Sequence, residues 1–123
     1  MAKKLPFAAF AVVRHGKGEI WATTRDGKDA GRVGLPGGKR DLGEHPEVTA
    51  RRESAEEGLH LHGKGRLVHV ALVDGQLVHW YEYMGCTPLR SYKEQARGIR
   101  AIIVPLAAIS TSGYGNDFLA LPE

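Results

Sequence analysis

The sequence predicts an α/β domain in which one helix lies between two groups of strands of a mixed β-sheet. Apolar runs of strand length occupy 7–14 before the helix, and 66–84 and 98–104 after it. The helix candidate of about three turns spans 46–57, and Asp74-Gly75 divides the second run as a hairpin turn would. One helix between two strand groups fits a mixed sheet better than an all-β barrel.

Length and composition fit a single soluble domain. The chain has 123 residues, of which 42% are hydrophobic and 25% are charged, so one core can bury most of the apolar side chains. No run approaches the roughly eighteen apolar residues of a membrane span. The run 7–13 is short and reaches Arg14 without a convincing cleavage site, so it predicts a buried strand rather than a signal peptide. We expect one domain over residues 1–123 of a cytoplasmic protein.

Charge and cysteine content argue against a nucleic-acid arm and a disulfide scaffold. The formal net charge is +3, and the basic residues are scattered rather than gathered in a dense run. Nucleic acid is therefore not an expected partner, although basic side chains beside a phosphate site would attract a polyanionic substrate. Cys86 is the only cysteine, so no intrachain disulfide can form. We expect Cys86 to be half-buried at the end of a strand.

Glycine-rich turns separate the elements of the N-terminal half. Residues 7–14 predict a central strand, Gly16-Lys17-Gly18 a turn, and 19–24 the antiparallel partner of that strand. Residues 25–34 are polar and rich in glycine, which predicts a loop, and 33–35 lead into a glycine corner at Gly37-Gly38. The glycine corner therefore comes shortly before the helix.

The predicted helix has a clear start and a clear stop. Pro46 suits a first helical turn, where its missing N–H does no harm. Gly58 suits a left-handed stop. Val48, Ala55 and Leu59 form an apolar stripe, which we expect to pack on the sheet.

The C-terminal half predicts a hairpin, a further strand and two short helical turns. The strands are expected at 66–73, 76–84 and 98–104, and the helical turns at 105–109 and 116–121. Within the hairpin, neighbouring residues point to opposite faces. At most one of Trp80 and Tyr81 would therefore line a pocket, with core packing expected for the other.

A fixed spacing of glycine, arginine and glutamate gives the strongest functional signal. The pattern G-x5-E-x7-R-E-x2-E-E is formed by Gly38, Glu44, Arg52, Glu53, Glu56 and Glu57. With a usage of about 7% at each position, a chance match is on the order of one in ten million. At about 100° per residue, the last three glutamates point into one arc of the helix. Because like charges at this spacing repel, the arrangement is easiest to explain if a hard cation such as Mg²⁺ or Mn²⁺ binds there.

Residues 38–57 resemble the signature box of the Nudix hydrolases, which hydrolyse nucleoside diphosphates linked to another group. Leu35-Pro36-Gly37 matches the usual lead-in of that box. The resemblance implies a Nudix-type α/β/α sandwich with a mixed β-sheet, and one or more Mg²⁺ ions, for which Mn²⁺ can substitute. The catalytic glutamates that would bind the metal, helped by a backbone carbonyl of Gly37 or Gly38, are Glu53, Glu56 and Glu57.

The resemblance also gives roles to residues outside the metal ligands. Glu44 would pair with Arg52 and hold the glycine loop against the helix. The general base is a box glutamate in some members of the family and an acid on a later loop in others. Glu94 is the best later candidate for this catalytic role, and Glu82, within a strand, is the second.

The chain departs from the family pattern in two places. The family usually has a bulky apolar residue after Arg-Glu, and here it is Ser54. It also usually has one residue between Glu-Glu and the following glycine, whereas Gly58-Leu59 follow directly here. This one-residue deletion lies beyond the last expected ligand, so it bears on the path of the next loop and on the substrate pocket.

The predicted activity is Mg²⁺-dependent cleavage of the diphosphate linkage of a nucleoside di- or triphosphate or a related nucleotide, with release of a monophosphate. Candidate phosphate contacts are Arg25, Lys39 and Arg97. Dinucleoside polyphosphates, ADP-ribose and capped RNA stay open as substrates. A rival interpretation is a nucleotide-binding module without catalysis, although such modules usually lose box glutamates and this chain keeps all of them. The sequence leaves open whether the protein is a monomer or a homodimer.

Overall fold

A four-stranded mixed sheet forms the centre of the protein. The computed structural model describes residues 7–24, 33–89, 98–111 and 114–120. Strand β1 runs parallel to β8 and antiparallel to β5, and β7 completes the sheet antiparallel to β8. In spatial order the strands are β5 (Gly37–Lys39), β1 (Phe7–Val12), β8 (Gln76–Glu82) and β7 (Arg66–Val73). The predicted mixed-sheet α/β class is confirmed.

A second sheet and a short strand pair complete the β-structure. The second sheet has β3 (Glu19–Thr24) between β10 (Ala101–Pro105) and β2 (Arg14–His15), and β4 (Val33–Gly34) also pairs with β3. The pair consists of β6 (Leu59–Leu61) and β9 (Cys86–Pro88). Cys86 is half-buried at the start of β9, and burial raises the pKa of its thiol to about 11.

The prediction that 19–24 is the antiparallel partner of the strand 7–14 is wrong for β1. Within residues 7–15, only Arg14 and His15, which form β2, pair with β3. The reason is that β5 and β8 occupy both edges of β1. The chain therefore reaches β3 only beyond β1, where the amide of Trp21 donates to the carbonyl of Val13 at 2.9 Å.

The hairpin predicted around Asp74-Gly75 is confirmed. Strands β7 and β8 pair from Arg66–Glu82 to Val73–Gln76, with an irregularity between Leu67 and His69. Both turn residues have positive φ, 49° for Asp74 and 79° for Gly75, as a tight two-residue turn requires.

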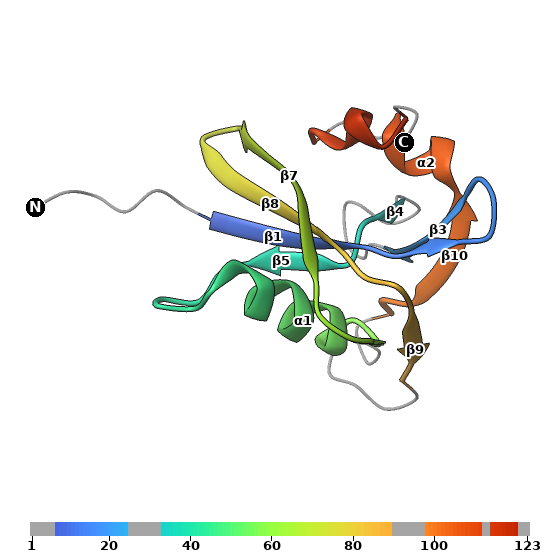
Figure 1. The fold of residues 1–123 in the computed structure, drawn as a ribbon, viewed down its shortest axis with the longest axis horizontal. Coiled ribbons are helices and arrows are strands. Elements are labelled where there is room, and N and C mark those ends of the chain that lie inside the picture. Colours follow the sequence, from blue (N-terminus) through green and yellow to red (C-terminus); the bar gives the residue numbers. More distant parts are fainter. Residues whose placement is uncertain (1–6, 25–32, 90–97, 112–113, 121–123) are drawn as a thin grey trace, which may run out of the picture.

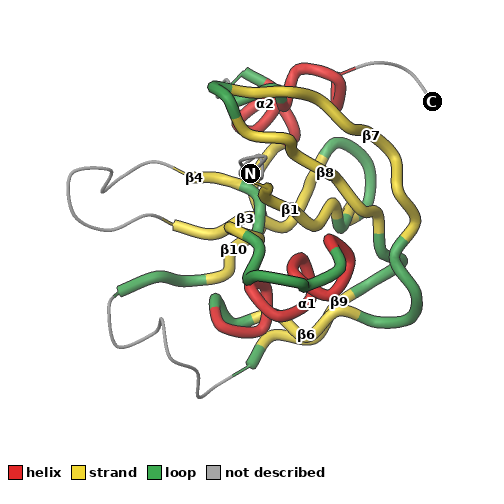
Figure 2. The backbone as a smooth tube through the Cα atoms, turned by 90° about the vertical axis from the view of Figure 1, so that its left-hand side faces the viewer, coloured by secondary structure: helices red, strands yellow, loops and turns green. Residues whose placement is uncertain are grey.

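Helices cover both faces of the central sheet (Figures 1 and 2). Helix α1 (Pro46–Glu56) lies on one face, while α2 (Leu106–Ser110) and the 3₁₀ helix η3 (Asn116–Ala120) lie on the other. This is the sandwich that the resemblance implied. No helix in the described ranges is long and apolar enough to cross a membrane.

Strand β1 is buried on both faces, which explains its continuous apolar run. Ala8 and Val12 pack in the cluster beneath α2 and η3, whereas Ala9 and Ala11 pack in the cluster beneath α1. Strand β8 alternates in the same way, because Trp80 belongs to the first cluster and Tyr81 to the second. Both of these aromatic side chains are therefore core residues.

Helix α1 begins and ends where predicted but is rotated about its axis relative to the expected apolar stripe. Its buried residues are Thr49, Ala50 and Ser54, whereas Val48 is 51% exposed. Leu59 is buried, but it lies in β6. The predicted stripe is therefore wrong, because polar contacts of the helix with the glycine corner, described below, fix its rotation.

Candidate active site

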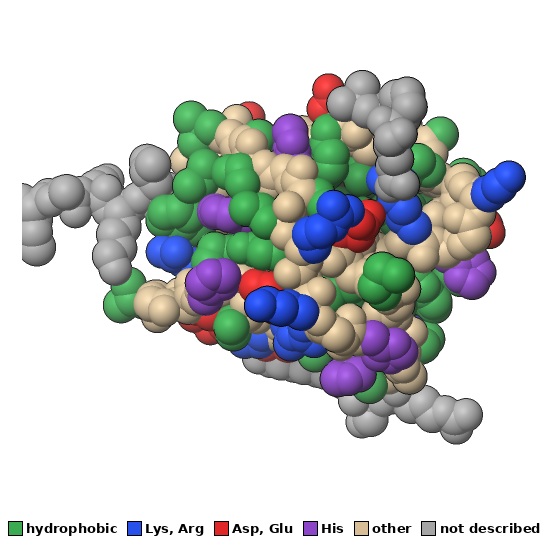
Figure 3. Space-filling view, viewed as in Figure 1, with side chains coloured by type: hydrophobic (Ala, Val, Ile, Leu, Met, Phe, Trp, Pro, Cys, Tyr) green, Lys and Arg blue, Asp and Glu red, His purple; other side chains and the backbone are tan. Residues whose placement is uncertain are grey.

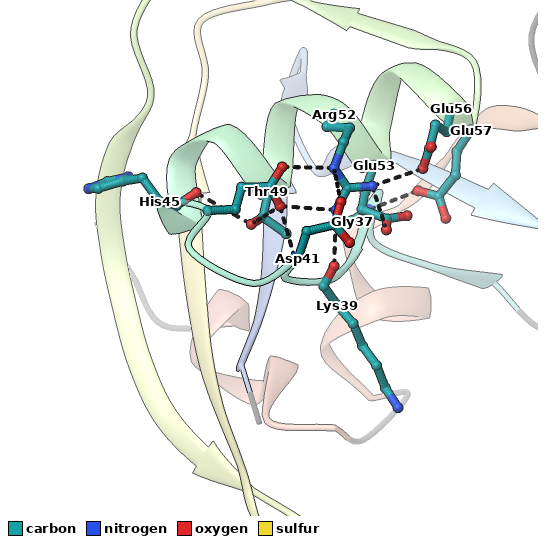
Figure 4. Close-up of polar contacts among 10 residues, drawn as sticks. Gly37, Lys39, Asp41, His45, Thr49, Arg52, Glu53, Glu56 and Glu57 are labelled. Atoms are coloured by element: carbon teal, nitrogen blue, oxygen red, sulfur yellow. Dashed lines mark hydrogen bonds and ion pairs between the residues drawn. The ribbon is translucent and has the colours of Figure 1, made fainter. Parts of the chain in front are cut away.

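One guanidinium group joins the glycine loop to helix α1 (Figure 4). Arg52 Nε donates to Glu44 Oε2 at 2.8 Å, and Arg52 Nη2 donates to Glu44 Oε1 at 3.0 Å. Such a two-pronged contact fixes direction as well as distance. Nη2 also donates to the backbone carbonyl of Lys39 at 3.1 Å, so the loop after β5 is held at two points.

The same guanidinium also contacts the acidic side of the helix. Arg52 Nη1 lies 3.1 Å from Glu53 Oε1 and 3.2 Å from Glu56 Oε2. The hydrogen bonds with Glu44 are the largest influence on Arg52 and raise its pKa above its already high usual value. Burial opposes this rise, and the hydrogen bond with Glu53 adds to it. The group therefore stays charged and offsets part of the repulsion among the neighbouring carboxylates.

Glu44 is held as a carboxylate. The hydrogen bonds from Arg52 lower its pKa to about 2, against the opposing effect of burial. The hydroxyl of Thr49 donates to Glu44 Oε1 at 2.7 Å, and the amide of Asp41 donates to the same oxygen at 3.1 Å. The Glu44 carboxylate thus accepts hydrogen bonds from its own loop, from the first turns of α1 and from Arg52.

Glu57 fastens the end of α1 to the glycine corner. Its Oε1 accepts a hydrogen bond from the buried backbone amide of Gly37 at 2.8 Å, and the residue is only 5% exposed. Gly37 has a φ of 145°, and a Cβ there would lie 2.3 Å from the carbonyl oxygen of Ala9. Only glycine lets the corner pass so close to β1.

Glu53 lies directly against the second glycine of the corner. A Cβ at Gly38 would lie 2.7 Å from Glu53 Oε2, so the absence of a side chain makes room for this carboxylate. Burial raises the pKa of Glu53, the hydrogen bond from Arg52 opposes this rise, and the charge of Glu56 adds to it. A bound cation would offset both the cost of burying this carboxylate and its repulsion by Glu56.

The residues present suit a hard divalent ion, although the described side chains do not form a ready-made cage. Among the described residues, no three His, Cys, Asp or Glu side chains are grouped to hold a metal as they stand. Of the three expected metal ligands, Glu53 and Glu56 contact Arg52, and Glu57 contacts the Gly37 amide. The donors gathered at the corner are nevertheless carboxylates and the Lys39 carbonyl, and oxygen ligands of these kinds are the ones that Mg²⁺ and Mn²⁺ prefer.

The other predicted site residues are distributed unevenly. Lys39 ends β5, is exposed, and points its side chain away from the Arg52 cluster in Figure 4. Arg25, Glu94 and Arg97 lie outside the described residues. Glu82 contacts Arg14 at 3.4 Å and Arg66 at 2.6 Å, so it is engaged in ion pairs rather than poised as a base.

Arg51 is a positioning residue that the sequence argument missed. Its Nη1 donates to the carbonyl of Leu61 at 2.8 Å and its Nη2 to that of Gly63 at 2.5 Å. Glu47, one helical turn earlier, contacts Arg51 at 3.4 Å. The Glu-x3-Arg spacing was a visible signal for such a pair, and Arg51 ties α1 to the end of β6 and to the segment after it.

Both departures from the family pattern have a local structural context. Ser54 is a fully buried residue of α1, and its small side chain lets the helix approach the sheet closely. Gly58 has a φ of 104° and leads straight into β6. The amide of Leu89 donates to the carbonyl of Gly58 at 2.8 Å. The shortened connection is thus held by the residue that follows β9.

Comparison with known proteins identifies the family. The NUDIX domain family matches residues 4–102. Because this match covers most of the sequence, the chain belongs to the NUDIX hydrolase family. No curated protein matches the sequence.

Solved structures share the fold at low sequence identity. The MutT NUDIX hydrolase from Burkholderia pseudomallei is 24% identical with a TM-score of 0.67, over 85% of each chain. The E. coli ORF135 protein is 17% identical with a TM-score of 0.63, over 95% of this chain and 87% of its own. An ADP compounds hydrolase is 16% identical with a TM-score of 0.64, over 95% of this chain and 63% of its own. At these identities the likeness establishes the fold.

Proposed function

We propose that the protein is a Mg²⁺-dependent pyrophosphohydrolase that cleaves the diphosphate linkage of a nucleoside di- or triphosphate, or of a related nucleotide, and releases a nucleoside monophosphate. The observation that carries this proposal is the meeting of the glycine corner with the acidic side of α1. Glu57 accepts from the Gly37 amide at 2.8 Å, and Glu53 fills the space that a side chain at Gly38 would occupy.

The proposed metal ligands are Glu53, Glu56, Glu57 and the backbone carbonyl of Gly38. A bound Mg²⁺ would offset the negative charge of the phosphate oxygens during cleavage. Arg52 now contacts Glu53 and Glu56 at 3.1 and 3.2 Å, so the ion would compete with it for these two carboxylates. The two-pronged contact of Arg52 with Glu44 does not involve these carboxylates and can persist.

The chemistry requires a proton acceptor and groups that hold the phosphates. Water adds to one phosphorus, the bridging P–O bond breaks, and a carboxylate accepts the proton released by the water. Among the described residues the box glutamates are the candidates for this role, because they lie at the corner where the metal and the diphosphate would meet. Glu94 is the alternative base. Lys39, Arg25 and Arg97 are proposed to contact the phosphates.

A substrate panel with and without Mg²⁺ tests the proposal. The panel contains nucleoside di- and triphosphates, dinucleoside polyphosphates, ADP-ribose and capped RNA, and the products are identified by chromatography. We expect Mg²⁺-dependent release of a monophosphate from one group, with strong loss in Glu57→Gln and none in Glu19→Gln, which changes an exposed glutamate of β3. No turnover on any substrate, together with tight nucleotide binding by calorimetry, would replace the enzyme with a binding module.

A further inference from the structure

Strand β7 forms an edge of the central sheet and carries apolar side chains into solvent. It pairs with β8 on one side, and no strand of the described residues pairs with its other side. Leu67, Val70 and Leu72 are 49%, 43% and 66% exposed. In Figure 3, hydrophobic side chains gather over the β7–β8 hairpin on this face.

This edge lacks the usual protection against pairing with another chain. Natural edge strands are commonly interrupted by lysine, proline or inward-pointing charge. Between Leu67 and Val73 there is no charged residue and no proline. The only irregularity lies between Leu67 and His69, which leaves the stretch from His69 to Val73 as a regular strand. A partner strand is therefore expected to find an open backbone there.

The turn geometry determines which backbone groups point outward. Val73 and Gln76 flank the two-residue turn and face each other, so they exchange backbone hydrogen bonds. Every second residue from Val73 therefore points its backbone toward β8, and the N–H and C=O groups of Val70 and Leu72 point away from it. These two residues also carry exposed apolar side chains, so backbone and side chains are available at the same positions.

We propose that β7 pairs antiparallel with β7 of a second copy of this chain, about a two-fold axis at Ala71. In this register Val70 lies opposite Leu72 of the second copy, and the reverse pair follows by symmetry. Each such pair exchanges two backbone hydrogen bonds. The apolar side chains of Val70 and Leu72 from both copies then form one continuous patch, so the contact is isologous and closes on itself.

Charges at the two ends of the strand complement each other in this register. Arg66 begins the strand and Asp74 follows its last residue, so antiparallel pairing brings Asp74 of one copy toward the Arg66 end of the second copy. Arg66 is positioned at the strand end by Glu82 at 2.6 Å. The two-fold axis repeats this approach of opposite charges at the other end, and no like charges meet within the stretch from Leu67 to Val73.

The proposed dimer leaves the candidate active site open. Strand β7 is at one edge of the sheet, and β5, which carries the glycine corner, is at the opposite edge. Substitutions in β7 should therefore change the oligomeric state without changing turnover per site. This separates the dimer from the proposed function in any experiment that measures both.

Light scattering after size-exclusion chromatography tests the dimer. The monomer has a mass of 13.4 kDa, so the two-fold dimer has twice that mass. At concentrations up to about 1 mM we expect the wild-type mass to approach the dimer value and Leu72→Lys to keep the monomer mass. Met84→Lys, at a 95% exposed apolar residue outside the strand, should dimerise like wild type, and circular dichroism checks that both variants fold.

Hydrogen–deuterium exchange locates the contact within the strand. On raising the concentration, the amides of Val70 and Leu72 should become protected, while those of Ala71 and Val73, which face β8, are protected throughout. A monomer at every concentration would overturn the proposal, and so would a dimer that Leu72→Lys leaves intact. Growth of open fibrils, or protection of Val70 and Leu72 in a monomer by an added apolar peptide, would assign the edge to another occupant.

Discussion

The two faces of the central sheet are held to their helices by different forces. Beneath α2 and η3 the contact is mainly apolar, and its fully buried side chains include Trp80, Ile109 and Leu119. One buried hydrogen bond, from Trp80 Nε1 to Asn116 Oδ1 at 3.1 Å, crosses it. Beneath α1 the helix buries only small residues, and directed polar contacts fix its rotation. Arg52 and Glu57 make the most important of these contacts. Apolar packing tolerates small rotations, whereas hydrogen bonds do not, so the polar face is the one that can set catalytic geometry.

The apolar face should contribute most of the stability. Leu119→Ala removes a side chain that is 1% exposed and should cost about 2–5 kcal/mol of unfolding free energy. Turnover of the folded protein should stay near wild type, because η3 lies across the sheet from α1. Urea denaturation measures the first quantity and steady-state kinetics the second. A large loss of turnover in folded Leu119→Ala at low temperature would contradict this difference between the two faces.

The polar face should show the opposite pattern at Glu57. Glu57→Gln keeps an oxygen that can accept from the Gly37 amide but removes the charge, so turnover should fall roughly a hundredfold or more with little change in Tm. Glu57→Ala removes both, and it should also lower Tm because a buried amide loses its acceptor. Kinetics and thermal denaturation of the pair separate the two roles. Equal Tm values for Glu57→Gln and Glu57→Ala would show that the hydrogen bond to the Gly37 amide does not contribute to stability.

Arg52 should affect both stability and activity. Arg52→Ala leaves several partly buried carboxylates without their shared cation, which should cost about 1–3 kcal/mol and lower Tm by roughly 5–10 °C. Arg52→Lys keeps the charge but not the two-pronged contact, so its Tm should fall between those of wild type and Arg52→Ala. An unchanged Tm in Arg52→Ala would show that the guanidinium does not hold the loop.

Gly38 should influence activity more than stability. A methyl group there would displace the carboxylate end of Glu53, which is flexible. Gly38→Ala should therefore lower turnover roughly tenfold or more, with only a small change in Tm. Gly85→Ala, where the nearest atom to a new Cβ is 3.4 Å away, is the matched control and should behave as wild type. Full activity in Gly38→Ala would show that the position of the Glu53 carboxylate does not matter for the reaction.

The smallest effect concerns acid stability. The pKa of Glu44 is about 2 in the folded protein and 4.5 in its ordinary state, so its contribution to stability is complete above about pH 4.5 and is lost as the pH falls toward 2. Glu44→Gln should therefore be less stable than wild type near pH 6, and the difference should shrink in acid. Urea denaturation at several pH values measures this. A difference that does not depend on pH would contradict the lowered pKa.

Local signals in the sequence anticipated much of the fold and less of its packing. Pro46 and Gly58 mark the true ends of the helix region, and Asp74-Gly75 marks the hairpin. The structure also has the contact of Glu44 with Arg52 that the family resemblance implied. Val48 misled the prediction of the buried side of α1, because the rotation of the helix depends on contacts with residues distant in sequence.

The pairing of very short strands and the pairing of strands distant in sequence could not be predicted from the sequence either. Strands β6 and β9 have three residues each, which is too short for an alternating pattern to be visible. The partner of β3 depends on which strands flank β1, and no local signal carries that information. The same holds for the contacts of Glu57 with Gly37 and of Glu53 with Gly38, which require the sheet and helix to be placed first.

Binding of Mn²⁺, used in place of Mg²⁺, tests the central claim that the polar face of α1 forms a metal-dependent catalytic site. Electron paramagnetic resonance measures the free ion during titration of wild type, Glu57→Gln and the control Glu19→Gln. We predict saturable binding to wild type and to the control, and binding at least about tenfold weaker in Glu57→Gln. Equal binding in all three proteins, or no binding to wild type in the presence of a hydrolysable nucleotide, would contradict the account.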